Sequence, residues 1–174
     1  MQNIEFHFSD LRLNGMRKTW QALLDTRRQH ELSLTEGLQM LLDAELIERS
    51  NRRSDRLVKT AKFRYQATLE QIRYDTSRGL DKNLITDLAT GQYIKDGASI
   101  IITGSTGCGK SYLASALGHQ ACAQGFKVAY YNVQKLMMKT RMARVDGSIY
   151  KFFEKISKTD LLILDDFGLT HLEK

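Results

Sequence analysis

Apolar residues in the first third of the chain recur at the three- and four-residue spacing of amphipathic helices. The first such stretch covers 9–29, with Ser9 as a candidate N-cap and an apolar face formed by Leu13, Met16, Trp20, Leu23 and Leu24. A second stretch opens on a capping-box sequence, Ser33 followed by Glu36. Its predicted buried stripe consists of Leu38, Leu41, Leu42, Leu46 and Ile47. These patterns predict a small all-helical domain over 1–65.

The pattern changes character after a mixed connector at 66–80. Asp81 is positioned to cap a short helix that ends at Gly91. The apolar runs at 98–103, 127–131 and 161–164 are typical of buried strands, and helices are expected at 110–123, 133–143 and 148–157. Strands that alternate with helices in this way form right-handed crossovers and a parallel sheet. Residues 81–174 are therefore predicted to form an α/β domain with helices flanking a parallel sheet.

A glycine-rich loop lies between the first predicted strand and the helix that follows it. Residues 104–111 match the phosphate-binding pattern G-x-x-x-x-G-K-[ST] at every defined position. Such glycines let backbone N–H groups face phosphate oxygens, and the helix N-terminus adds its positive dipole end. Lys110 is predicted to contact the β- and γ-phosphates, and Ser111 to coordinate Mg²⁺. The predicted nucleotide contacts are Gly104, Ser105, Thr106, Gly107, Cys108, Gly109, Lys110, Ser111 and Tyr112.

Two carboxylates follow the third predicted strand. Asp165 at its carboxyl end can reach a Mg²⁺ ion held by Ser111, so these two residues form the predicted metal site. Asp166 stands where a carboxylate can orient or deprotonate an attacking water molecule. A strand-end carboxylate without a catalytic role is the alternative for Asp166. The predicted catalytic residues are Lys110, Asp165 and Asp166.

Positive charge is concentrated in two segments. The chain has 26 lysines and arginines against 20 acidic residues, a net charge of +6. Residues 49–64 hold seven basic residues against one aspartate, and 135–158 hold seven against two acidic residues. Two basic segments on an otherwise acidic body favour a polyanionic partner, with nucleic acid as the first candidate. For either segment a solvated helix face is the alternative. The predicted DNA contacts are Arg49, Arg52, Arg53, Arg56 and Lys59.

Other features bear on where the protein acts. No apolar run approaches the roughly 20 residues that span a bilayer, and the N-terminus lacks the pattern of a signal peptide. Two cysteines are too few for a disulfide framework or a metal cluster. The expected location is the cytoplasm, with no membrane partner.

The order of these motifs resembles the IstB family, the helper ATPases of insertion-sequence transposons and relatives of the helicase loader DnaC. The resemblance is carried by 78–85, by the loop at 104–111, by 116–119, and by an Asp-Asp-Phe-Gly ending at 165–168. The front helices and 59–63 are similar to the N-terminal domain of the family. The resemblance implies a P-loop NTPase fold of the AAA+ type, with ATP and Mg²⁺ as cofactors.

The resemblance also implies a function and partners. Family members assemble on double-stranded DNA as ATP-dependent oligomers and assist a transposase. A DnaC-like loader that acts on a replicative helicase is one alternative, and a non-catalytic DNA-binding or inhibitory fragment is another. Only eight residues follow Asp166, whereas such a fold requires further strands, a sensor residue and an arginine that completes a neighbour's site. An ATPase domain incomplete at its C-terminus is therefore expected, which binds ATP but hydrolyses it poorly.

Overall fold

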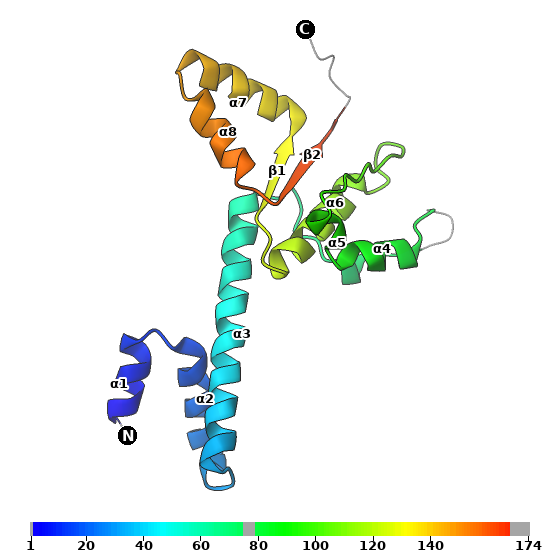
Figure 1. Cartoon of the computed structure of the whole chain (residues 1–174). Coiled ribbons are helices and arrows are strands. Elements are labelled where there is room, and N and C mark those ends of the chain that lie inside the picture. Colours follow the sequence, from blue (N-terminus) through cyan, green and yellow to red (C-terminus); the bar gives the residue numbers. More distant parts are fainter. Residues whose placement is uncertain (1, 75–78, 168–174) are drawn as a thin grey trace. The chain divides into compact units, whose positions relative to one another are not determined.

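The computed structural model describes residues 2–74 and 79–167. Arg78 and Gly168, which belong to the motifs quoted above, lie outside the described residues, as does 169–174. The chain divides into two compact units, Met1–Arg53 and Ser54–Lys174, which are described separately below. They are called the N-terminal unit and the C-terminal unit, and their elements are labelled in Figure 1.

The N-terminal unit contains two short helices where the sequence predicted one. These are α1 (Gln2–Asp10) and α2 (Asn14–Asp25), followed by a 3₁₀ turn, η1 (Arg28–His30). The prediction of a single helix over 9–29 is therefore wrong, and so is the role of Ser9, whose Oγ donates to the carbonyl of Glu5 within α1. The chain turns at Arg12, which adopts a left-handed φ of 56°. A residue in that conformation cannot continue a right-handed helix.

A buried carboxylate explains why a helix restarts at Asn14. Glu45 accepts hydrogen bonds from the backbone N–H groups of Gly15 (2.7 Å) and Met16 (3.3 Å), so it caps the first turn of α2 from another helix. Gly15 allows this approach because a Cβ there would lie 2.3 Å from the carbonyl oxygen of Ala44. Arg49 pairs with the second carboxylate oxygen of Glu45 at 2.7 Å. Burial opposes the charge on Glu45, but these bonds outweigh it and lower its pKa.

Glu45→Ala is expected to destabilise the N-terminal unit by about 2–3 kcal/mol, because the buried N–H of Gly15 and the partly buried N–H of Met16 lose their acceptor. Chemical denaturation monitored by Trp20 fluorescence measures this change. The folded state lowers the pKa of Glu45, so its stabilisation is complete above the pKa of the unfolded chain. That stabilisation is lost as the pH falls towards the lower pKa of the folded state. The exposed Glu31→Ala variant is the control, and an equal loss in both variants contradicts the capping role.

The long helix α3 (Leu34–Ala61) begins as predicted, because Ser33 and Glu36 form a capping box. The Ser33 N–H donates to Glu36 at 2.8 Å, and the Glu36 N–H donates to Ser33 Oγ at 3.3 Å. The predicted buried stripe is wrong, since Leu41 alone among its members is buried. The exposed members are Leu38, Leu42, Leu46 and Ile47, at 50%, 46%, 67% and 61%. The short α2 covers too little of α3 to bury a stripe of that width.

The C-terminal unit follows the predicted order of helices and strands for most of its length. It contains η2 (Leu69–Gln71), α4 (Lys82–Ala89), α5 (Gln92–Lys95) and α6 (Lys110–Ala123). These are followed by β1 (Val128–Asn132), α7 (Val133–Val145), α8 (Ile149–Ser157) and β2 (Leu161–Asp165). Asp81 caps α4 as predicted, accepting from the Asn83 N–H at 2.8 Å. The strands pair in parallel, with Val128 opposite Leu161 and Asn132 opposite Asp165, while α7 and α8 form the crossover (Figure 1).

The strand predicted at 98–103 is absent from the described part of the chain. This segment leads into the phosphate loop without a ladder partner, and Ile101 is 86% exposed. Ile102 packs against the apolar cluster of Ile85, Leu113 and Leu117. A β-branched run becomes a strand only where a neighbouring strand accepts its backbone hydrogen bonds, and β2 pairs only with β1 among the described residues.

The core of the C-terminal unit lies between α6, the two strands and the last turns of α3. Ala61, Ala121, Cys122 and Val128 are buried together, with Leu57 and Val58 packed against them. Burial raises the pKa of the Cys122 thiol to about 11, as befits a packing residue. The two compact units divide after Arg53, whereas the helical domain predicted from the sequence ran to residue 65. The last turns of α3 belong to the second unit because Leu57 and Val58 pack against its core.

A glycine sets the distance between α6 and its neighbours. A Cβ at Gly118 would lie 2.4 Å from the ring of Phe63 and 2.8 Å from Ile163 Cδ1. This explains the glycine within the 116–119 motif, because the helix can approach β2 and the segment after α3 only without a side chain there.

Among the described residues, no helix combines the length and the apolar character required to cross a bilayer.

Candidate nucleotide-binding site

The loop before α6 has the backbone conformation that its glycines allow. Gly104, Gly107 and Gly109 adopt φ values of 151°, 82° and 95°, which L-amino acids with side chains rarely adopt. A Cβ at Gly104 would also lie 3.0 Å from Cys108 Sγ. The loop ends at the N-terminus of α6, a fourteen-residue helix whose first residue is Lys110. A helix N-terminus behind a loop of this shape suits an anionic phosphate group.

The Lys110 ammonium group contacts the backbone of this loop. Its Nζ donates to the carbonyl oxygens of Gly104 at 2.9 Å and Ser105 at 2.8 Å. The cation is therefore held against the loop, where it would meet the β- and γ-phosphates of a nucleotide. The side chain of Tyr112 points elsewhere, since its hydroxyl donates to Gln71 Oε1 at 2.7 Å. Tyr112 thus joins α6 to η2 and does not reach the phosphate loop through its hydroxyl.

The loop and the end of β2 come together at Ser111 and Asp165. Ser111 Oγ donates to Asp165 Oδ1 at 2.7 Å, across 54 positions of sequence. Hydroxyl and carboxylate oxygens are the ligands that Mg²⁺ prefers, together with waters and phosphate oxygens. The two residues predicted to hold the metal are adjacent, and their donor atoms fit it. Mg²⁺ bound there would neutralise charge on the phosphates of a nucleotide.

Three further side chains, outside the set predicted from the sequence, contact the two aspartates. Tyr130 donates a short hydrogen bond to Asp165 Oδ2, and Asn132 donates to Asp166 Oδ2 at 2.6 Å. Arg64 lies 3.3 Å from Asp165 Oδ2 and 3.4 Å from Asp166 Oδ2. Parallel register brings Tyr130 and Asn132 to this edge of the sheet, because Asn132 lies opposite Asp165. The pattern of strand residues could have indicated Asn132, but nothing in the sequence indicates Arg64.

These contacts set the charge state of the site. Partial burial acts to raise the pKa of Asp165. The net effect is nevertheless a lowered pKa, because Asp165 accepts hydrogen bonds from Tyr130, Ser111, the backbone N–H of Asp166 and Arg64. Burial and the neighbouring carboxylate raise the pKa of Tyr130. Asp165 is therefore ionised and Tyr130 stays a hydrogen-bond donor at neutral pH. Asp166 has a left-handed φ of 57°, which turns the chain after β2.

The predicted DNA-contacting residues lie on the solvent side of α3. Arg49, Arg52, Arg53, Arg56 and Lys59 are all exposed. Their three- and four-residue spacing places them on one side of a helix, away from Leu57, Val58 and Ala61. Arg49 has a structural partner in Glu45, as described above. The basic residues of 135–158 are exposed as well, on α7 and α8 and at Lys158 after them.

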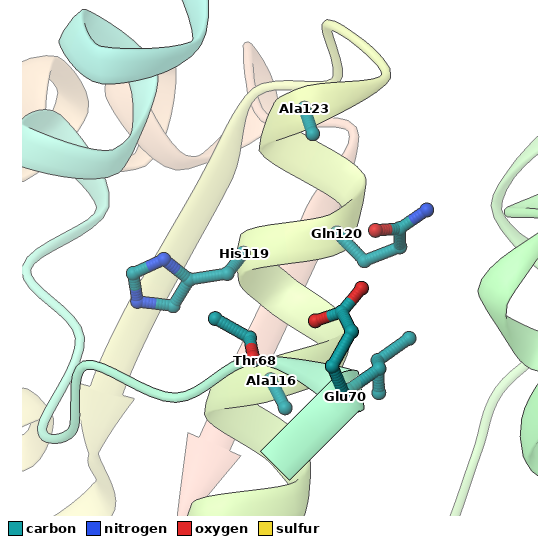
Figure 2. A pocket seen from close by; sticks show the side chains of 7 residues that line it. Thr68, Glu70, Ala116, His119, Gln120 and Ala123 are labelled. Carbon is teal, nitrogen blue, oxygen red and sulfur yellow. The ribbon is translucent and has the colours of Figure 1, made fainter.

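A small pocket of the C-terminal unit is separate from the phosphate loop. It has a volume of about 150 Å³ and lies between η2 and the middle of α6, lined by Thr68, Leu69, Glu70, Ala116, His119, Gln120 and Ala123. Figure 2 shows the side chains of Glu70 and Gln120 on one side of α6, with that of His119 pointing away from them. The His119 ring stacks on Phe63 at 4.4 Å. The pocket lies one to three turns of α6 beyond Ser111, so it is not the phosphate site.

The family model described as IstB-like ATP binding protein matches residues 7–174. The chain belongs to the IstB family. The match includes most of the first compact unit and all of the second, with the basic turns of α3 and the two aspartates at the end of β2. It also confirms the predicted fold class, a P-loop NTPase α/β domain preceded by helices.

Similar proteins come from several bacterial insertion sequences. The ATP-binding protein of insertion sequence IS1162 from Pseudomonas fluorescens is 42% identical over 94% of this chain. The insertion-sequence ATP-binding protein y4pL of Sinorhizobium fredii is 37% identical over 93%, and Rv3427c of Mycobacterium tuberculosis is 31% identical over 91%. The chain spans 71%, 66% and 63% of the lengths of these relatives. It is thus a member of an ATP-binding family associated with insertion sequences.

Proposed function

We propose that this chain binds Mg²⁺·ATP, hydrolyses it slowly, and acts as a DNA-associated helper of a transposase. The contact that carries the proposal joins Ser111 to Asp165 at 2.7 Å, because it brings a phosphate loop and a strand-end carboxylate to one point. When bound, Mg²⁺ supplies the charge that neutralises the phosphate oxygens between these residues. Lys110 adds a second positive charge from the loop side. The family's association with insertion sequences supports the assignment to transposition.

Asp166 is proposed to orient the attacking water molecule. Its carboxylate lies next to the metal-site residue Asp165, and Asn132 fixes it by a hydrogen bond of 2.6 Å. The side chain of Asp165 is 10% exposed and that of Asp166 is 30% exposed, which divides a more buried carboxylate at the metal site from one that water reaches more easily. This division leaves Asp165 ionised for the cation and Asp166 available as an acceptor for a water proton.

Asp166→Asn is expected to leave Mg²⁺·ATP affinity within about twofold and to lower hydrolysis at least about a hundredfold. Asparagine has the same shape and tolerates a left-handed φ, so the fold is preserved. Calorimetry measures the affinity, and phosphate release measures turnover with and without duplex DNA. Asp87→Asn on α4 is a matched control that should change neither. Weakened binding with normal turnover would reverse the roles of the two aspartates.

DNA association is supported by the exposed basic side of α3 and by the basic residues of α7 and α8.

A protein partner is supported by a different surface of the N-terminal unit. There, the leucine and isoleucine side chains of α3 named above are exposed, and one of them, Leu38, also lines a cavity of about 190 Å³ together with Trp20, Leu23 and Leu41 among others. A transposase is the partner proposed for this surface, and a replicative helicase is the alternative, since both would contact it through apolar groups. Pull-down of purified transposase or helicase with the chain distinguishes them.

A further inference from the structure

Arg64 is placed at the two aspartates by the segment that follows α3. The helix ends at Ala61, and Lys62 adopts a left-handed φ of 59° that redirects the chain. Phe63 is then anchored, because its ring stacks on His119, with 4.4 Å between ring centroids, and forms a T-shaped pair with Tyr130 at 6.1 Å. With Phe63 fixed, the next side chain points towards the carboxyl end of β2. The guanidinium also lies over the Tyr65 ring, 5.4 Å from its centroid.

One guanidinium nitrogen of Arg64 forms ion pairs with both carboxylates. Arg64 Nη1 lies 3.3 Å from Asp165 Oδ2 and 3.4 Å from Asp166 Oδ2. The opposite oxygen of Asp165 is the one that contacts Ser111. A metal ion held by Ser111 and Asp165 would therefore approach a carboxylate that already has a cation on its other side. The Arg64 side chain is half exposed, so water can replace it when it leaves.

We propose that the Arg64 guanidinium pairs with Asp165 and Asp166 while the site is empty, and that it leaves these carboxylates when Mg²⁺ and nucleotide bind. This inference rests on the proposed nucleotide site. Two neighbouring carboxylates repel each other, and the guanidinium compensates their charge while no metal is bound. A divalent cation at the same carboxylates repels the guanidinium, so each binding event weakens the other. Binding of Mg²⁺ and nucleotide would detach Arg64, and the segment after α3 that carries it, from the two aspartates. The nucleotide state would in this way be coupled to α3, the helix that carries the basic residues.

The competition predicts that removal of the arginine tightens metal binding. Mn²⁺ is the probe, titrated by electron paramagnetic resonance into the full chain saturated with the non-hydrolysable nucleotide AMPPNP. Arg64→Ala and Arg64→Gln are expected to bind Mn²⁺ about tenfold more tightly than the parent, whereas Arg64→Lys, which keeps the charge, stays within about threefold. Lys95→Ala removes an exposed charge on α5 of the same unit and should leave the affinity unchanged.

Release of the segment has its own measurement. Trypsin cleavage after Arg64, followed by mass spectrometry, is expected to accelerate at least about threefold in the parent when Mg²⁺ and AMPPNP are added together. Unchanged or weaker Mn²⁺ binding by both neutral variants, or cleavage that Mg²⁺·AMPPNP does not accelerate, overturns the role of Arg64. If AMPPNP fails to bind the parent chain by calorimetry, the proposed nucleotide site fails instead, so the two failures are distinguishable.

Discussion

Lys110→Ala is expected to weaken binding of Mg²⁺·ATP by at least about a hundredfold. In the parent, the ammonium group is held against the phosphate loop by the carbonyl oxygens of Gly104 and Ser105. Without it, the β- and γ-phosphates face backbone dipoles and a metal ion, and removing a charge-assisted interaction of this kind has a large effect. Isothermal calorimetry of the purified chain measures the change.

Two controls separate the loss of the charge from damage to the loop. Lys95→Ala removes an exposed charge on α5, away from the loop, and should leave ATP affinity unchanged. Thermal unfolding without nucleotide should show similar midpoints for Lys110→Ala and the parent, because the two hydrogen bonds that the variant lacks involve a solvent-accessible ammonium group. Equal ATP affinity of Lys110→Ala and the parent would contradict the assignment of 104–111 as the phosphate site.

Reversing Arg52, Arg53 and Arg56 to glutamate is expected to weaken duplex DNA binding about a hundredfold at ~0.1 M salt, without lowering ATP affinity. Each arginine that meets a phosphate releases about one condensed counterion, so binding falls steeply with salt and shows little sequence preference. The slope of log affinity against log salt concentration should become shallower by roughly one unit for each arginine–phosphate pair that the substitutions remove. Fluorescence anisotropy with labelled duplex over a salt series measures both quantities. Glutamate is a good helix former, so α3 is retained.

The matched control carries the same change in net charge elsewhere. Reversing Lys82, Lys95 and Lys127, which are exposed and lie outside both basic segments, should leave the salt slope unchanged. If the α3 triple variant and this control weaken binding equally, the protein attracts DNA through its overall charge. An unchanged affinity and slope in the α3 variant would mean that its basic side is solvated or contacts a protein partner.

Local sequence was sufficient wherever neighbours along the chain make the decisive contacts. The capping box at Ser33 and Glu36, the cap at Asp81 and the helix over 110–123 were all predictable, because their hydrogen bonds join residues within four positions of one another. The phosphate loop was predictable for a related reason, since its glycines and Lys110 form one continuous segment. The parallel order of β1 and β2 followed from the alternation of strands and helices.

Contacts between distant segments decided the rest. An apolar run at 98–103 predicts a strand, yet a strand also needs a partner, and β2 pairs only with β1 in the described residues. The break before α2 depends on Glu45, thirty positions away, and the buried stripe of α3 depends on how little of it α2 covers. The sequence by itself determined the glycine-rich motif at 104–111, the basic segments and the family. Only the tertiary structure brought Arg64 and Tyr130 to Asp165, because side chains that meet from separate segments leave no spacing in the sequence.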